Sequence, residues 1–315
     1  MNLGLSLLGL GNSGTGGGAS EPEGSIIAGA GFFTVSGQEA ILTQTHTALD
    51  AAQGSYTLSG QDATLTYSGG GAAFSPDDIS GLELWLKGDG TIADTSGLVD
   101  QWNDESGNAR HVTASGTDRP STGTRTINSV NVMDFTGSGQ RRLEGSDGLG
   151  FTGSPNITIF VVSEVDSSAS SQHALVHFGA TASGGGTVIS VNDGDRSYRF
   201  NNGFRGFTNA STSTPTITLW EHAASDTYAD VALWANGVAQ TQDGVSGGTN
   251  TLSLADERTL IGLRTGGSGS TNYTSPLVGA IAEVLVYSAV LSTSEKNDVG
   301  QYLDDRWGIT WTDIT

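Results

Sequence analysis

The chain has 315 residues, no cysteine, 47 glycines and 6 prolines, and its 33 acidic against 13 basic side chains give a net charge of −20. Nucleic-acid partners require clustered Lys and Arg, so this charge argues against them. Without cysteine there is no thiol catalysis, disulfide or Cys-based zinc site. A hydrophobic content of 36%, without a long apolar run, indicates a globular protein and no membrane insertion.

The first 75 residues contain no Lys or Arg, and residues 1–30 form a Gly-rich N-terminal arm whose composition is that of a flexible linker. The first basic side chain is Lys87, so the opening lacks the positive segment of a secretory signal. We therefore expect synthesis in the cytoplasm without export by that route.

An internal repeat follows the arm. Residues 31–43 read GFFTVSGQEAILT, and residues 54–66 read GSYTLSGQDATLT, a shift of 23 residues. Alternating apolar and polar residues around Ser-Gly-Gln predict that each copy is a β-hairpin. Two hairpins are marginal alone, so residues 31–75 are expected to be an attachment region that partners complete, with strand pairing between subunits of a homo-oligomer.

From residue 76 the sequence predicts many short strands separated by Gly-, Ser- and Asn-rich turns, which is typical of a β-sandwich. Asn236-Gly237 is a two-residue hairpin turn. Ser292 and Glu295 form a capping box that begins one C-terminal helix. The strands are expected at Leu82 onward, 130–135, 157–165, 174–178, 187–191, 198–201, 216–221, 231–235, 259–263 and 280–287.

Residues 76 to about 310 resemble the LamG-like, concanavalin A-like lectin/glucanase superfamily. The segments that carry the resemblance are LELWLKGDG, VDQWNDESGNAR, VMDFTGSGQRRL, ITIFVVSEV, VALWANGVAQ, TLIG and GAIAEVLVYSAVLSTSEKNDVGQYLDDRWGI. The resemblance implies an all-β, antiparallel jelly-roll β-sandwich over residues 76–315 with one C-terminal helix, preceded by the small β-hairpin-repeat anchor. Such modules bind carbohydrate or protein, sometimes with a calcium ion.

The Gly/Leu-rich opening and the Gly-Gln-x-Ala-x-Leu repeats look like virion proteins of tailed bacteriophages. This resemblance implies a protein on the surface of a phage particle, in the tail, a fibre or the head decoration, with other virion proteins as partners through residues 1–75. The lectin-like module would bind cell-surface or environmental glycans. Two alternatives stay open: a capsid cement protein without a ligand, and a glycosidase that cleaves polysaccharide.

A sugar site needs exposed aromatic rings beside polar groups. The candidates, all in or beside Gly/Asn-rich segments, are Tyr198, Phe204, Phe207, Tyr228 and Tyr273. The oxygen-bearing side chains of Asn192, Asp193 and Asp195 make one candidate calcium site, and no other cofactor is expected.

Three further groups are interpreted as structural. Glu164-Val165-Asp166 lacks the third carboxylate that glucanases of this fold carry, so we expect no enzyme and no catalytic residue. His173 and His177, four apart on a strand, should share one face, but they lack a third metal ligand. The Trp102–Asn108 stretch, WNDESGN, is expected to form a turn that supports the fold.

Overall fold

The computed structural model describes residues 74–136, 139–166, 172–179, 186–192, 195–200, 203–207, 214–227, 229–246, 249, 251–265 and 273–315. It also describes four strands near the N-terminus: β1 (Phe33–Ser36), β2 (Ile41–Leu42), β3 (Tyr56–Ser59) and β4 (Thr64–Leu65). The chain divides into two compact units, Met1–Ala72 and Ala73–Thr315. This division lies close to the expected domain boundary at residue 75.

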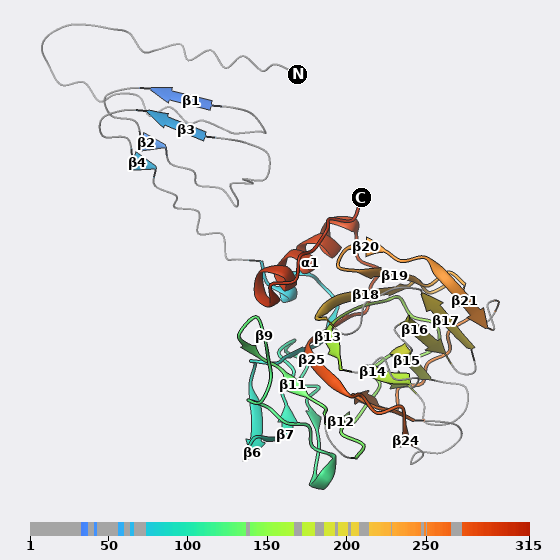
Figure 1. The fold of residues 1–315 in the computed structure, drawn as a ribbon. Coiled ribbons are helices and arrows are strands. Elements are labelled where there is room, and N and C mark those ends of the chain that lie inside the picture. The colour runs from blue at the N-terminus through green and yellow to red at the C-terminus, as the bar shows by residue number, and fades with distance from the viewer. Residues whose placement is uncertain are drawn as a thin grey trace, which may run out of the picture. The chain divides into compact units, whose positions relative to one another are not determined.

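The larger unit contains a ten-stranded antiparallel sheet (Figure 1). From one edge to the other its strands are β21 (Gln242–Ser246), β17 (Gly203–Phe207), β16 (Asp195–Phe200), β15 (Gly186–Asn192), β14 (Gln172–Gly179), β22 (Thr259–Ile261), β12 (Leu143–Gly145), β8 (Val112–Thr113), β7 (Leu98–Trp102) and β6 (Ile92–Thr95).

A seven-stranded antiparallel sheet faces the first. Its order is β11 (Met133–Asp134), β25 (Gly279–Tyr287), β13 (Ile157–Val165), β18 (Thr216–His222), β19 (Ala232–Ala235) and β20 (Val238–Ala239), with β5 (Leu82–Lys87) also paired to β25. Two small pairs join β9 (Thr126–Ile127) to β10 (Val130–Asn131) and β23 (Arg264–Thr265) to β24 (Tyr273–Thr274). The short 3-10 turns are η2 (Pro76–Asp78) and η3 (Gly116–Asp118), and the helix is α1 (Thr293–Trp307).

The larger unit has three layers: the ten-stranded sheet, the seven-stranded sheet and α1. Hydrophobic residues of β13 show how the middle layer contacts the other two. Ile159 and Val161 point into the core between the two sheets, while Phe160 and Val162 belong to a second core beneath α1. Side chains alternate across a strand, so a nearly continuous apolar run predicts burial on both faces. Figure 1 shows α1 along the seven-stranded sheet. The predicted all-β sandwich with one C-terminal helix is therefore confirmed.

Local sequence signals form as predicted. The Ser292 hydroxyl accepts a hydrogen bond from the backbone of Glu295, and the Glu295 carboxylate accepts one from the Ser292 backbone, at 3.3 and 2.8 Å. Asn236 and Gly237 have φ of 51° and 80°, as a tight turn between β19 and β20 requires. Among the described residues, no helix combines the length and apolar character needed to cross a membrane.

The predicted pairing inside each N-terminal repeat is wrong. β1 pairs with β3 and β2 pairs with β4, both in parallel, so the two copies lie beside each other instead of folding into separate hairpins. The register joins Phe33 to Tyr56 and Val35 to Leu58. Parallel strands need a connection of a dozen or more residues, and residues 37–55 supply it between β1 and β3. The constant offset of 23 residues between the copies then places corresponding residues side by side.

The carboxylate of Glu283, on β25, joins the seven-stranded sheet to α1. Its Oε1 accepts hydrogen bonds from the Trp85 indole at 2.6 Å and the Tyr302 hydroxyl at 2.9 Å. Its Oε2 accepts one from the Trp307 indole at 2.7 Å and lies 3.2 Å from Arg306 Nε. The side chain of Glu283 is fully buried, and this burial raises its pKa against the opposing effect of the three hydrogen-bond donors and the charge of Arg306.

Replacing Glu283 should cost far more stability than replacing an exposed acidic residue. In Glu283→Ala, two indoles and a phenol lose their shared acceptor and Arg306 loses a buried counter-charge, so the free energy of unfolding should fall by about 3–5 kcal/mol. Asp305→Ala, an exposed acid on the same helix, should stay within about 0.5 kcal/mol of wild type. Urea unfolding followed by tryptophan fluorescence measures both, and equal losses would contradict the anchoring role.

Candidate functional site

A polar cleft of about 440 Å³ lies on the ten-stranded sheet, over β8, β12 and the segments that flank them. The alternation of the strands creates it. Val112 and Leu143 are buried in the core between the sheets, whereas their neighbours Thr113 and Glu144 line the cleft. Because successive side chains point to opposite faces, one short strand serves the core and the cleft together.

Charged pairs form much of the lining. The carboxylate of Glu144 lies between two guanidiniums, with Oε1 3.2 Å from Arg258 Nη1 and Oε2 3.8 Å from Arg142 Nε. Arg142 Nη1 also lies 2.9 Å from the carboxylate of Asp118. The arginine side chains are 16% and 18% exposed, and the two carboxylates 33% and 36%. The pairs are therefore held in place and still reach solvent.

Hydroxyl groups complete the cleft. Thr113, Ser115 and Ser146 line it, together with the carboxylate of Glu257. Carboxylates and guanidiniums offer paired acceptors and paired donors, and hydroxyls offer either. This set can bind a ligand that presents several adjacent hydroxyl groups. The described lining residues include no aromatic ring.

Sequence reasoning missed this cleft because its residues come from separate segments near positions 113–118, 142–146 and 257–258. One local pattern was available: Arg142 and Glu144 flank the apolar Leu143, as on a half-buried strand. That pattern predicts a polar face, but it does not say which other segment lies against it.

Of the predicted aromatic sugar site, Phe207 is contradicted. It is 1% exposed and belongs to the core between the sheets, because its place on β17 turns it inward. Tyr198, Phe204 and Tyr273 lie on β16, β17 and β24 respectively. Tyr228 falls outside the described residues. For these four, a role in binding stays a prediction.

The candidate calcium ligands lie at a hairpin. Asn192 ends β15 and pairs with Asp195, which begins β16, and Asp193 falls outside the described residues. Within the part of the chain that the structure describes, no group of three His, Asp or Glu side chains could hold a metal ion. The calcium site stays a prediction.

The carboxylates of Glu164 and Asp166 share one guanidinium. Arg125 Nη2 lies 2.8 Å from Glu164 Oε2 and 2.5 Å from Asp166 Oδ1. This pairing ties the end of β13 to the segment before β9. The geometry agrees with the interpretation of these two carboxylates as structural.

The two histidines of β14 were predicted to share one face of the strand, and this prediction is wrong. An extra residue between Ala174 and Val176 shifts the register, so that His173 pairs with core Val191 while His177 lies on the opposite face. His173 Nδ1 lies 3.0 Å from the Pro276 carbonyl. Burial, aided by the charges of two arginines, lowers the pKa of His177 to about 3. His177 is therefore neutral at physiological pH.

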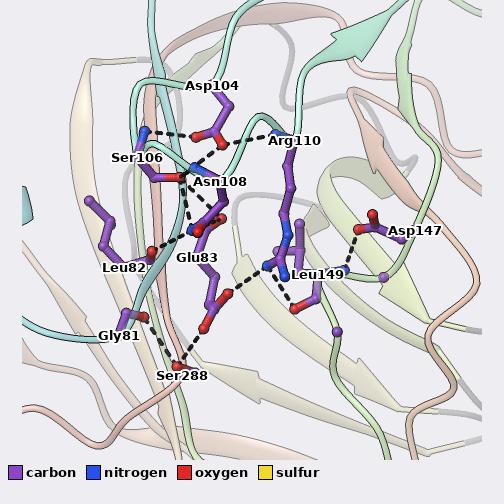
Figure 2. Close-up of polar contacts among 12 residues, drawn as sticks. Gly81, Leu82, Glu83, Asp104, Ser106, Asn108, Arg110, Asp147, Leu149 and Ser288 are labelled. Atoms are coloured by element: carbon purple, nitrogen blue, oxygen red, sulfur yellow. Dashed lines mark hydrogen bonds and ion pairs between the residues drawn. The ribbon is translucent and has the colours of Figure 1, made fainter.

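The WNDESGN stretch forms the predicted turn, and Asp104 is its centre (Figure 2). Its carboxylate accepts hydrogen bonds from the backbone of Trp85, Ser106 and Arg110 at 2.9–3.0 Å. Arg110 Nη1 then lies 2.6 Å from Glu83 Oε2. Figure 2 shows how these contacts join the turn to β5. Trp102 is fully buried, so the stretch supports the fold.

With this geometry in place, comparison with solved structures gives the class of fold. The chain is similar to the binding domain of botulinum neurotoxin serotype D, with 12% identity, a TM-score of 0.50, and coverage of 75% of this chain and 55% of that one. A serotype D ligand-binding domain in complex with N-acetylneuraminic acid gives 13% identity, a TM-score of 0.51, and coverage of 75% and 55%.

A third structure comes from a study of botulinum neurotoxin type C, whose cell entry depends on interaction with two ganglioside molecules; it shows 10% identity, a TM-score of 0.51, and coverage of 72% and 52%. This chain matches about half the length of these solved chains. At such identity the likeness shows a shared fold. No protein-family model and no curated protein sequence matches the chain.

The lowered pKa of His177 has a consequence for stability. The unfolded chain binds a proton near pH 6.5 and the folded chain only near pH 3, so stability present above pH 6.5 is lost as pH falls, by up to about 1.4 kcal/mol per pH unit. His177→Gln removes this contribution. As pH falls from 6.5 to 4.5, wild type should therefore lose unfolding free energy relative to the variant. Urea titrations at several pH values measure this, and a constant difference between the two proteins would contradict it.

Proposed function

We propose that the Ala73–Thr315 unit is a non-enzymatic, lectin-like module that binds glycans in the polar cleft. The observation that carries this proposal is the cleft itself, in which Glu144 pairs with Arg258 and Asp118 pairs with Arg142 beside hydroxyl side chains. Sugars present adjacent hydroxyls that both donate and accept hydrogen bonds, and ordered carboxylates and guanidiniums satisfy them in pairs. Groups held in place before binding lose little conformational entropy when a ligand arrives.

Two further observations support a glycan. The fold is similar to that of a neurotoxin domain solved with N-acetylneuraminic acid, and the sequence resembles lectin-like modules. The charge of the cleft narrows the class of sugar. Three carboxylates, Asp118, Glu144 and Glu257, accompany two guanidiniums, on a chain of net charge −20. Like charge repels an acidic sugar, so we expect this cleft to prefer a neutral glycan, in contrast to the acidic N-acetylneuraminic acid of that neurotoxin domain.

The same proposal places the protein on the surface of a tailed-phage particle, in the tail, a fibre or the head decoration. Support comes from the Gly/Leu-rich opening and the Gly-Gln-x-Ala-x-Leu repeats. The smaller unit, Met1–Ala72, would attach to other virion proteins, while the sandwich would be displayed.

Glycan binding is tested with the full chain on an array of neutral and sialylated glycans. We expect binding to neutral members, and about a tenfold or greater loss in Arg142→Ala, because one charge-assisted hydrogen bond is worth about 1.5–3 kcal/mol. Ser146→Trp should weaken binding at least as much, since Ser146 is exposed in the cleft and the indole would fill it.

Arg125→Ala is the matched control. It removes a guanidinium of similar exposure that also pairs with two carboxylates, outside the cleft lining. Binding by Arg125→Ala should equal that of wild type. Equal binding by all four proteins would remove the cleft from the proposal. An empty array would contradict glycan binding and favour a cement protein.

Location on a particle is tested by immunogold electron microscopy of purified phage particles from the source lysate, with an antibody against residues 76–315. We expect gold on the particles. Label at the tail tip or fibres would indicate a role in contact with the host cell, and label over the head would indicate capsid decoration. Unlabelled particles would overturn the virion assignment and leave the cleft assay unaffected.

A further inference from the structure

In the smaller unit, the four described strands form two layers, β1 with β2 and β3 with β4. β1 pairs in parallel with β3 and β2 with β4, and the residues that pair are 23 positions apart throughout. The offset in space therefore equals the offset of the sequence repeat. Each copy of the repeat is one layer of a stack, as in proteins built from repeated units.

Such a stack is incomplete with two layers. Among the described strands, β1 and β2 have the second copy as their partner and β3 and β4 have the first. An edge strand presents unpaired N–H and C=O groups that can pair with another chain. Two-stranded units are marginally stable in water, and repeat stacks need about three layers. On the described strands, a third layer could come from another chain.

We propose that a second copy of this chain supplies it, so that β1 of one copy pairs in parallel with β3 of another. The register within one chain carries the argument. Within one chain, β3 pairs with β1, the strand Phe33–Ser36. Every further copy of the chain carries the same β1 strand, which can pair with β3 in the same way. Pairing between copies would use the other edges of β1 and β3 and would repeat the parallel direction and register that the fold already contains. This proposal does not depend on glycan binding.

Single cysteines test the register, because the chain contains no native cysteine. Ser36 pairs with Ser59 within the chain, and the same partners should meet between copies. Neighbouring strands lie about 4.8 Å apart, within the Cα separation of about 4.4–6.8 Å that a disulfide tolerates. Full-length Ser36→Cys mixed with full-length Ser59→Cys should therefore give covalent dimers under mild oxidation.

The control mixture pairs Ser36→Cys with Ser80→Cys, a variant at an exposed position of the larger unit, and should give at least tenfold less dimer. Leu58→Pro provides a second test, because proline removes a backbone donor and is excluded from paired strands. Sedimentation should show association of wild type and loss of association in Leu58→Pro, with unchanged tryptophan fluorescence of the sandwich.

Three results would overturn the proposal: cross-linking no higher than the control, stronger cross-linking in Ser59→Cys alone than in the mixture, or a monomeric wild-type chain at high protein concentration. The second result would mean that β3 of one copy meets β3 of another. Because the readouts concern the repeats alone, each outcome leaves the glycan assay interpretable.

Discussion

The buried carboxylate of Glu283 is the constraint on which the larger unit depends. Removing a charged group from water costs several kcal/mol, and the three hydrogen-bond donors and the Arg306 charge around Glu283 offset that cost only while α1 stays on the sheet. The hydrogen bonds therefore fix one position for the helix. With α1 over one face of the seven-stranded sheet and the core over the other, both faces of that sheet are occupied. The ten-stranded sheet is the one that presents the cleft.

Elements that short-range chemistry determines were predictable. The capping box of Ser292 and Glu295 begins α1 as expected, and Asn236-Gly237 makes its turn, because each depends on neighbours a few residues away. Strand pairing is different, since it depends on which segments meet. The repeats were predicted to fold into hairpins from their alternation alone, yet their similarity to each other decides the pairing.

The candidate site was beyond sequence reasoning for a related reason. Arg142 and Arg258 meet at Glu144 only because β12 lies beside β22. Nothing in either segment alone indicates the other. One added residue has a similar effect in β14, where the register shift separates His173 from His177 across the strand. Phe207 was misplaced because loop-like composition nearby concealed a strand whose inward position is buried.

The two proposals reinforce each other through valency. If the cleft of about 440 Å³ binds neutral sugars as proposed, its hydrogen bonds would compete with water for every contact, and its affinity for one sugar would be low. Copies joined through β1 and β3 would raise the effective concentration of clefts at a surface that carries many glycans. The overall affinity of linked weak sites can exceed that of a single site by about 10²–10⁴-fold without new contacts. Self-association through the repeats would thus convert a weak cleft into a strong attachment.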